Sequence, residues 1–374
     1  MKKIIIVPPN GKFKSQDFFI HRLSEYLYIN NYEAKLVKIK EDFDEEICLS
    51  IPIISLDNVE HLLFYLTTSN FDLIIHRCWM HSYSFAALLS QHCSNVVFYI
   101  KDWFAEISRE QYKLIYHTDS DYDGIKTLFE SNKKILTHYT MEYIIAIWSK
   151  KYCIDINNFT FFPEYTIKSK HHIRINTSYD SKNVKLLLLG SLFPTCNPTE
   201  ICNQRQVLND IKLITSQKIQ FDRMVLEKTY DNVMNSPLYI DYKYEHLFNS
   251  YFNIIQGSAF NSKDTEYYHF GVYQLLDVSN YDSKDANSTL HAVVSKFANY
   301  LEAGLPILVN ENFKYISAIV KKYDIGIVIS NNEAKDLKCV LNIEEGRYQT
   351  LISNVYIFRD MYSYNFETLK SILS

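Results

Sequence analysis

Glycine is scarce in this chain, with 8 glycines in 374 residues where average usage would give roughly 26. Even the closest pair, Gly257 and Gly271, is far apart in the sequence. The dinucleotide-binding fingerprint, the Walker A loop and the protein kinase loop need glycines about two to five positions apart. The sequence excludes these three sites, so any phosphate binding has to come from a helix N-terminus and from side chains.

Cysteine pairs, long apolar runs and an excess of basic charge are also missing. The 7 cysteines include no C-x-x-C pair, which argues against a disulfide framework or a zinc knuckle and favours reduced thiols. No run of about 18 apolar residues occurs, and Ile4–Val7 is too short for a secretory signal. The 43 acidic and 39 basic side chains give no reason to expect a nucleic-acid partner. We therefore expect a cytoplasmic protein, and peripheral contact with a membrane stays open.

Short β-branched runs alternate with segments of helical periodicity, which is typical of parallel α/β units. Fully apolar runs such as Val96–Ile100 predict sheets that are buried on both faces. The predicted organisation is a domain over residues 1–165, a linker over 166–183, a second domain over 184–350 and a C-terminal helix over 351–374. Two α/β domains of similar size predict a cleft between them, which is a favoured place for a ligand.

One segment in the second half of the chain contains a candidate anion-binding site. It begins at Ser295 and reads SKFANYLEAGLPI, so Ser295 suits a helix N-cap. Gly304 suits the position after the helix, and Pro306 prevents the helix from continuing. A helix that begins with a hydroxyl and Lys296 can bind an anion through free N–H groups, the helix dipole and the ammonium group. The alternative is a surface helix with a capped end and no ligand.

This segment resembles the donor-binding part of the GT-B glycosyltransferases, a class of mostly retaining enzymes that use nucleotide sugars. Their pattern is roughly P-x-K-x-x-E-Y-x-x-x-G-x-P-[IV], followed by a helix and a short strand such as Gly326–Val328. VVFYIKDWFAE at residues 96–106, and KKILTHYTMEYI at 133–144 followed by FTFFPE at 159–164, are similar to motifs of the same family. The resemblance covers nearly the whole chain in order and implies an α/β protein of two Rossmann-like domains facing each other across a cleft.

The resemblance also implies a donor site on the second domain and an acceptor side on the first. The implied donor-binding residues are Gly190, Ser191, His291, Ser295, Lys296, Asn299 and Tyr300. Lys296 would contact the diphosphate, which a helix terminus and a lysine can neutralise without a metal or another cofactor. On the first domain, the implied acceptor-side residues are Asn10, Gly11 and Trp103, and the implied catalytic residues are Asp102 and His138.

The sequence departs from the family pattern at several positions. Asn299 stands where the family has a carboxylate, and Lys101 stands where it has a histidine. The turn after Gly190 lacks the arginine and the Lys-Gly pair that are usual there. Glu302 is not at the matching position, and we interpret it as a residue on the helix surface.

An acidic segment raises a separate hypothesis of metal binding. Asp119, Asp121 and Asp123, with Glu130, satisfy the EF-hand pattern. The same aspartates form the D-x-D pattern with which metal-dependent glycosyltransferases hold a nucleotide diphosphate. The segment is single, however, and its aspartates also suit the N-terminus of a helix over residues 125–131. We interpret it as that helix start and expect no metal.

These observations favour transfer of a sugar from a nucleotide-sugar donor to a glycan or lipid-linked acceptor. The resemblance is most in keeping with the synthesis of a bacterial surface polysaccharide at the inner face of the cytoplasmic membrane, without a divalent metal. Two alternatives stay open: a nucleotide-sugar epimerase of the same fold, and a catalytically silent sugar- or protein-binding module. Their products differ, because transfer needs an acceptor, epimerisation needs none, and a binding module releases nothing.

Overall fold

The computed structural model describes residues 2–13, 17–40, 49–79, 82–101, 109–110, 113, 119–150, 155–174, 178–190, 203–258, 260–275 and 290–373. Asp102, Trp103 and Ser191 therefore lie outside the described residues. The chain divides into two compact units, each of which we describe by itself. Unit 1 is Met1–Ile167 with Tyr364–Ser374, and unit 2 is Lys168–Ser363.

Unit 1 is built on a parallel sheet whose order in the described residues is β3-β2-β1-β4-β5-β6-β7. Its strands are β1 (Lys3–Val7), β2 (Glu33–Ile39), β3 (Ile53–Leu56), β4 (Leu73–Cys78), β5 (Val96–Ile100), β6 (Ile135–Thr137) and β7 (Phe159–Phe161). Its helices are α1 (Phe18–Ile29), α2 (Val59–Thr68), α3 (Tyr83–His92), α5 (Ser120–Glu130), α6 (Met141–Tyr143) and α17 (Phe366–Leu373). A π-helix (Ile144–Ser149) and short 3₁₀ turns (Pro9–Gly11, Ile156–Asn158) complete the unit.

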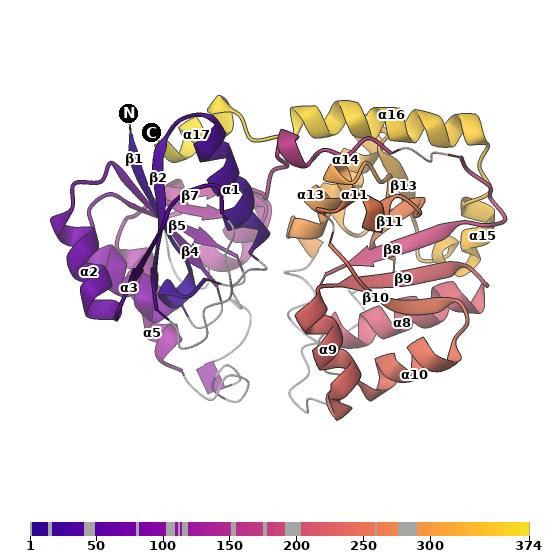
Figure 1. Cartoon of the computed structure of the whole chain (residues 1–374), viewed down its shortest axis with the longest axis horizontal. Coiled ribbons are helices and arrows are strands. Elements are labelled where there is room, and N and C mark those ends of the chain that lie inside the picture. Colours follow the sequence, from indigo (N-terminus) through magenta and orange to yellow (C-terminus); the bar gives the residue numbers. More distant parts are fainter. Residues whose placement is uncertain are drawn as a thin grey trace. The chain divides into compact units, whose positions relative to one another are not determined.

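The C-terminus of the chain belongs to the core of unit 1. Leu369 and Ile372 of α17 lie in one apolar cluster with Phe19 and Leu23 of α1 and with the buried side chains of β1. Figure 1 labels α17 near α1 and β1 in this unit. Residues 351–374, expected as one C-terminal helix, therefore contribute to two helices, of which α17 packs on unit 1 and α16 (Glu345–Met361) belongs to unit 2.

Unit 2 has a second parallel sheet, with the order β10-β9-β8-β11-β12-β13 in the described residues. Its strands are β8 (Lys185–Leu189), β9 (Gln220–Val225), β10 (Phe252–Gln256), β11 (Phe270–Gln274), β12 (Ile307–Asn310) and β13 (Gly326–Ile329). Its helices, besides α16, are α8 (Asn203–Ser216), α9 (Glu227–Asn235), α10 (Ile240–Phe248), α11 (Ser262–Thr265), α13 (Ser295–Glu302), α14 (Lys314–Tyr323) and α15 (Leu337–Val340). Short 3₁₀ turns occur at Lys168–Lys170, Pro237–Tyr239 and Glu333–Asp336.

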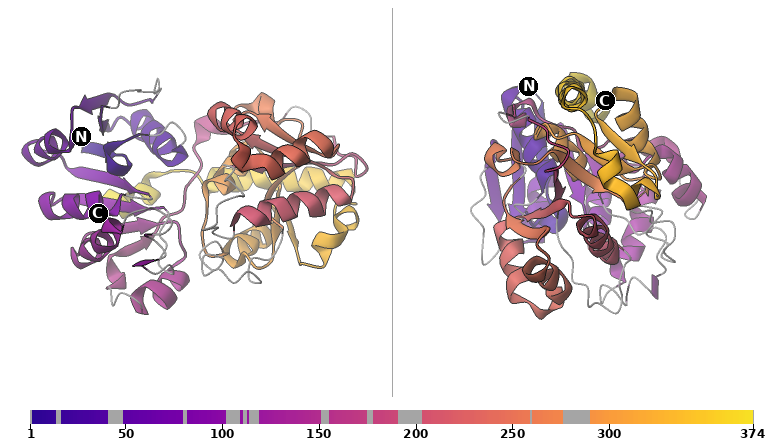
Figure 2. Two further views of the ribbon diagram at one scale, coloured as in Figure 1. Left: turned by 90° about the horizontal axis from the view of Figure 1, so that it is seen from below. Right: turned by 90° about the vertical axis from the view of Figure 1, so that its right-hand side faces the viewer.

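Helices cover both faces of the unit 2 sheet, with α8, α9 and α10 on one side and α13 and α16 on the other (Figure 1). The right-hand view in Figure 2 shows the same helices on the two sides of this sheet. The predicted fold class, two α/β units with parallel sheets, is thus confirmed. None of the helices in the described residues has the length and apolar character that a membrane-spanning segment needs.

Candidate functional site

The order of strands in unit 2 identifies where a ligand would bind. The chain fills the sheet outward from β8 on one side and from β11 on the other, so the direction of winding reverses between these two strands. In open α/β sheets, ligands bind at the carboxyl ends of the strands beside this reversal. Gly190 directly follows β8 there, with a φ of 123° that favours glycine. Leu275 directly follows β11 at the same edge of the sheet.

Tyr273, near the end of β11, holds the segment that leads into α13. Its side chain is 1% exposed. Its hydroxyl donates to the carbonyl oxygen of Ala292 at 2.9 Å and accepts from the N–H of Val294 at 3.3 Å. Because both partners lie just before α13, these bonds fix the N-terminus of that helix close to the end of β11.

The N-terminus of α13 has free backbone donors. The N-cap residue is Val294, in an extended conformation and without a side-chain cap, so the prediction of Ser295 as N-cap is wrong. Ser295 is instead the first helical residue, because the backbone already turns helical there. The N–H groups of Ser295 and Lys296 have no acceptor among the residues that the structure describes. Two free donors therefore begin this helix, at its positive end.

Lys296 adds a positive charge beside these donors. Its ammonium group donates to the carbonyl oxygen of Tyr273 and lies 4.7 Å from the centre of the Tyr273 ring. Burial, and then the charge of Arg223, lower the pKa of Lys296 to about 7, against the opposing effect of Asp210. Within the described part of the chain, no carboxylate forms an ion pair with Lys296. The lysine is thus half-buried and has no carboxylate partner among the residues that the structure describes.

Three residues of this site were not found by sequence reasoning: Tyr273, Arg223 and Asp210. Arg223 lies in β9 and donates from Nε to the carbonyl oxygen of Gly190 at 3.1 Å. The carboxylate of Asp210, in α8, is 2% exposed and accepts from the N–H of Leu275 at 3.5 Å. The available signal was the run QFDRMV, where an arginine interrupts a short β-like pattern.

Tyr300 and Asn299 lie deeper than the other residues implied for the donor. Tyr300 is fully buried, and its hydroxyl accepts from the N–H of Leu189 at 3.0 Å and donates to the carbonyl oxygen of Val272 at 2.7 Å. It therefore ties α13 to both strands beside the reversal. Asn299 is 4% exposed, and His291 is half-buried. The structure thus brings Gly190, Ser295 and Lys296 to one edge of the sheet, with Tyr300 beneath them.

The rest of α13 corrects one interpretation and confirms another. Glu302, interpreted as a surface residue, is fully buried, because α16 packs on α13 and Arg359 of α16 donates to its carbonyl oxygen at 3.4 Å. Gly304 follows the helix with a φ of 68°, as the sequence predicts for that position.

In unit 1, the residues implied for the acceptor side also follow strand ends. Asn10 and Gly11 lie in the turn after β1, both with positive φ. His138 follows β6, is 2% exposed and packs 4.4 Å, between ring centres, from Tyr139. Burial, followed by the charges of Arg77 and Lys101, holds the pKa of His138 well below its usual value, so this imidazole is neutral at physiological pH.

The acidic segment forms the start of a helix. α5 begins at Ser120, earlier than the predicted residue 125, and Asp119 is its N-cap residue. Arg109 pairs with Asp119 at 3.0 Å and with Asp123 at 2.8 Å. The described residues contain no group of three or more histidine, cysteine or acidic side chains arranged to hold a metal ion.

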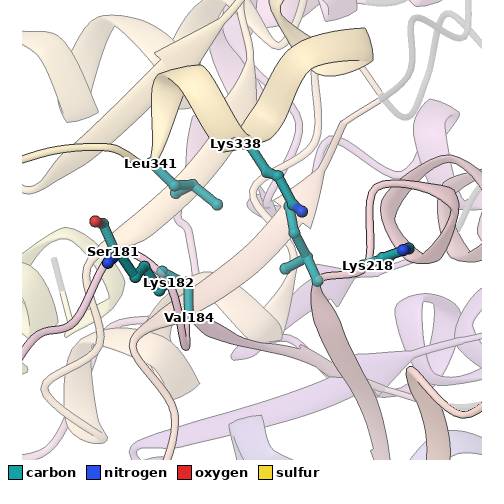
Figure 3. A pocket seen from close by; sticks show the side chains of 7 residues that line it. Ser181, Lys182, Val184, Lys218, Lys338 and Leu341 are labelled. Carbon is teal, nitrogen blue, oxygen red and sulfur yellow. The ribbon is translucent and has the colours of Figure 1, made fainter.

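A small pocket lies at the other edge of the unit 2 sheet (Figure 3). Its lining residues precede β8 and β9 or lie in and directly after α15, and they include Lys182, Lys218 and Lys338. The cavity volume is about 20 Å³, which is room for about one water molecule. Since it lies at the amino ends of the strands, it is separate from the edge that carries Gly190 and Lys296.

Comparison with known proteins shows which fold the chain has. Residues 256–373 match the family model described as "Glucosyltransferase 3-like, C-terminal domain". The solved structure of WaaG, a glycosyltransferase involved in lipopolysaccharide biosynthesis, matches with a TM-score of 0.62 and 12% identity over 100% of this chain and 98% of WaaG. The chain has the GT-B fold.

Two further structures share the fold of this chain over its whole length. Sucrose-phosphate synthase from Thermosynechococcus elongatus has a TM-score of 0.65 at 11% identity, with 100% of this chain and 96% of that chain covered. TarM from S. aureus has a TM-score of 0.63 at 10% identity, with 100% and 99% covered. No curated protein sequence matches the chain.

Proposed function

We propose that the protein is a glycosyltransferase that takes its sugar from a nucleotide-sugar donor bound at the strand reversal of unit 2. The observation that carries the proposal is the N-terminus of α13, where two free backbone N–H groups and the ammonium group of Lys296 occur together. A departing nucleoside diphosphate accumulates negative charge, and fixed donors at a helix N-terminus stabilise that charge. The acceptor would be recognised by unit 1, around the turn at Asn10 and Gly11 and near His138.

Similar proteins support a uridine nucleotide and a surface polysaccharide. The TarM structure is a complex with UDP and α-GlcNAc-glycerol, and WaaG is involved in lipopolysaccharide biosynthesis. By analogy, we propose a UDP-sugar donor, a glycan or lipid-linked acceptor, and a role in a bacterial surface polysaccharide. The enzyme would then work in the cytoplasm, at the inner face of the cytoplasmic membrane.

The proposed reaction needs neither a metal nor an enzyme nucleophile. The bond between the anomeric carbon and the diphosphate oxygen breaks, and a bond to the acceptor hydroxyl oxygen forms with retention. The hydroxyl proton passes to the departing diphosphate. Lys296 and the N–H groups of α13 would neutralise the leaving group, which is the task a divalent cation performs elsewhere. Neutral His138 would orient groups by hydrogen bonding, and Asp102 is the second residue that the resemblance implies for catalysis.

Binding and product analysis test the proposal in two stages. A thermal-shift screen of UDP, GDP, ADP and dTDP should stabilise the protein selectively with one of them, because a ligand that binds the folded state raises its stability. Incubation with the matching nucleotide sugar should release nucleoside diphosphate only when an acceptor is present, and turnover should survive EDTA. Formation of an isomeric sugar in the absence of acceptor would identify an epimerase. If no donor gave any product, the protein would be a binding module without catalytic activity. Loss of turnover with EDTA and rescue by Mg²⁺ or Mn²⁺ would overturn the metal-independent mechanism.

A further inference from the structure

Arg223 reaches from β9 to the turn that follows β8. It pairs in register with Leu188 of β8, and its Nε donates to the carbonyl oxygen of Gly190 at 3.1 Å. The side chain is 4% exposed, so the guanidinium group is held in one place. A buried cation is costly unless nearby groups compensate it.

The open side of Gly190 faces this guanidinium group. A Cβ atom built on Gly190 would lie 3.8 Å from Nη2 of Arg223. Among the described residues, no other atom lies within 4 Å of that position. An anionic group that used the space left by the missing side chain would therefore meet the guanidinium at contact distance. This is the situation in which glycine allows a phosphate to approach the backbone closely.

The chain after β8 supplies no cation of its own, because residues 191–202 contain neither lysine nor arginine. The cations of the site come instead from two other elements, Arg223 from β9 and Lys296 from α13. Each influences the other, since the charge of Arg223 is one cause that lowers the pKa of Lys296. The other described groups that face the pair are the carboxylate of Asp210 from α8, which opposes this shift, and the side chains of Tyr242 from α10, Tyr273 from β11 and Tyr300 from α13.

We propose that Arg223 is a second binding residue for the diphosphate of the donor and acts with Lys296 as one anion-binding pair. This inference rests on the proposed function, because it assumes that a nucleoside diphosphate occupies the strand reversal of unit 2. It adds a residue from β9, a strand in which the sequence analysis found no site residue. An anion between the two cations relieves their mutual repulsion, so its binding draws a proton onto Lys296.

The experiment compares binding of a nucleoside diphosphate with binding of its parent nucleoside. The ligand is the tightest of UDP, GDP, ADP and dTDP, measured by calorimetry at pH 8 in two buffers that differ in heat of ionisation. At this pH the terminal phosphate, with a pKa of about 6, is already ionised, so it takes up no proton. Arg223→Met should weaken diphosphate binding about tenfold or more and leave nucleoside binding unchanged. Wild type should take up most of one proton per ligand, and Arg223→Met should take up less, because loss of the Arg223 charge removes one of the two causes that lower the pKa of Lys296.

The controls separate a binding role from a structural one. Arg347→Met removes an exposed arginine of the same unit that pairs with Asp324, and it should change neither quantity. If Arg223→Met does not fold, Arg223→Lys keeps the charge without the forked donor, and its diphosphate affinity should fall while its nucleoside affinity holds. Unchanged diphosphate affinity and proton uptake in the folded variant would overturn the role of Arg223 and leave the proposed function intact. A wild type that binds none of the four diphosphates would overturn both.

Discussion

The ammonium group of Lys296 donates a hydrogen bond to the carbonyl oxygen of Tyr273 and lies 4.7 Å from the centre of its ring. A carbonyl dipole and a ring face attract a cation, but neither carries a full negative charge. The lysine is thus held in place, and its charge is only partly compensated. Such a cation is suited to bind an anion, and it weakens the folded state while no anion is bound.

The first consequence concerns affinity. Lys296→Met should weaken binding of the nucleoside diphosphate by about 1–3 kcal/mol, the size of a hydrogen bond to a charged group. Calorimetry at pH 7 measures the change. Lys314→Met is the matched control, because Lys314 is also near the start of a helix in unit 2 but is exposed. Equal affinity in wild type and Lys296→Met would remove the lysine from the phosphate site.

The second consequence concerns the stability of the protein without ligand. The pKa of Lys296 is lowered to about 7 in the folded state, whereas a lysine in an unfolded chain titrates at about 10.4. Between these values the unfolded chain binds a proton that the folded protein does not, so the lysine's contribution to stability rises with pH. At pH 7 and below, the buried charge destabilises the folded state most.

Lys296→Met should therefore stabilise the ligand-free protein at pH 7, by about 1–3 kcal/mol, because the methionine keeps an apolar stem without the charge. Urea unfolding followed by circular dichroism measures the difference, which should shrink toward zero as the pH rises to about 10. If the variant is less stable than wild type at pH 7, the ammonium group is well solvated and our account of its environment fails.

Much of the fold could be predicted because several of its strands are almost entirely apolar. β5 is a run of buried aliphatic and aromatic residues, and its predicted bounds, Val96–Ile100, agree with the structure. β9 and β11 were not predicted, because QFDRMV carries two charges and FGVYQ contains a glycine. In the structure these polar side chains are satisfied by tertiary contacts, such as the bond from Tyr268 to Asp222 at 2.7 Å. A local sequence pattern carries no information about such tertiary contacts.

The residues of the candidate site also differ in whether a local sequence pattern could predict them. Lys296 could be predicted from a motif, since helix start, lysine, glycine and proline all lie within one short segment. Arg223 and Asp210 could not, because they come from other elements that meet Lys296 only after both sides of the sheet have formed. The buried position of Glu302 depends in the same way on α16, which lies later in the chain.

Tyr300 should matter for stability first and for binding second. Tyr300→Phe removes the hydroxyl that the N–H of Leu189 and the carbonyl oxygen of Val272 share. Leaving a buried N–H without an acceptor costs about 1–3 kcal/mol, which urea unfolding would detect. Tyr244→Phe, at a side chain that is 62% exposed, should cost almost nothing. Equal stability of the two variants would mean that another group satisfies Leu189.

Unit 1 contains a buried ionic network that should respond strongly to mutation. Arg77 donates to Asp17 and to Glu164, each at 3.2 Å, and Arg22 donates to Glu164 at 3.4 Å. All four side chains are at most 3% exposed. Arg77→Met leaves two buried carboxylates with less compensation and should cost about 3–5 kcal/mol in the free energy of unfolding.

Urea unfolding of Arg77→Met tests this cost against an exposed ion pair of the same unit. Lys40 and Asp57 lie 3.1 Å apart with both side chains 62% exposed, so Lys40→Met should cost less than about 1 kcal/mol. The two carboxylates are far apart in the sequence, since Asp17 caps α1 and Glu164 follows β7, and Arg77 joins the two segments. If Arg77→Met costs no more than Lys40→Met, water replaces the guanidinium and the network does not hold these segments together.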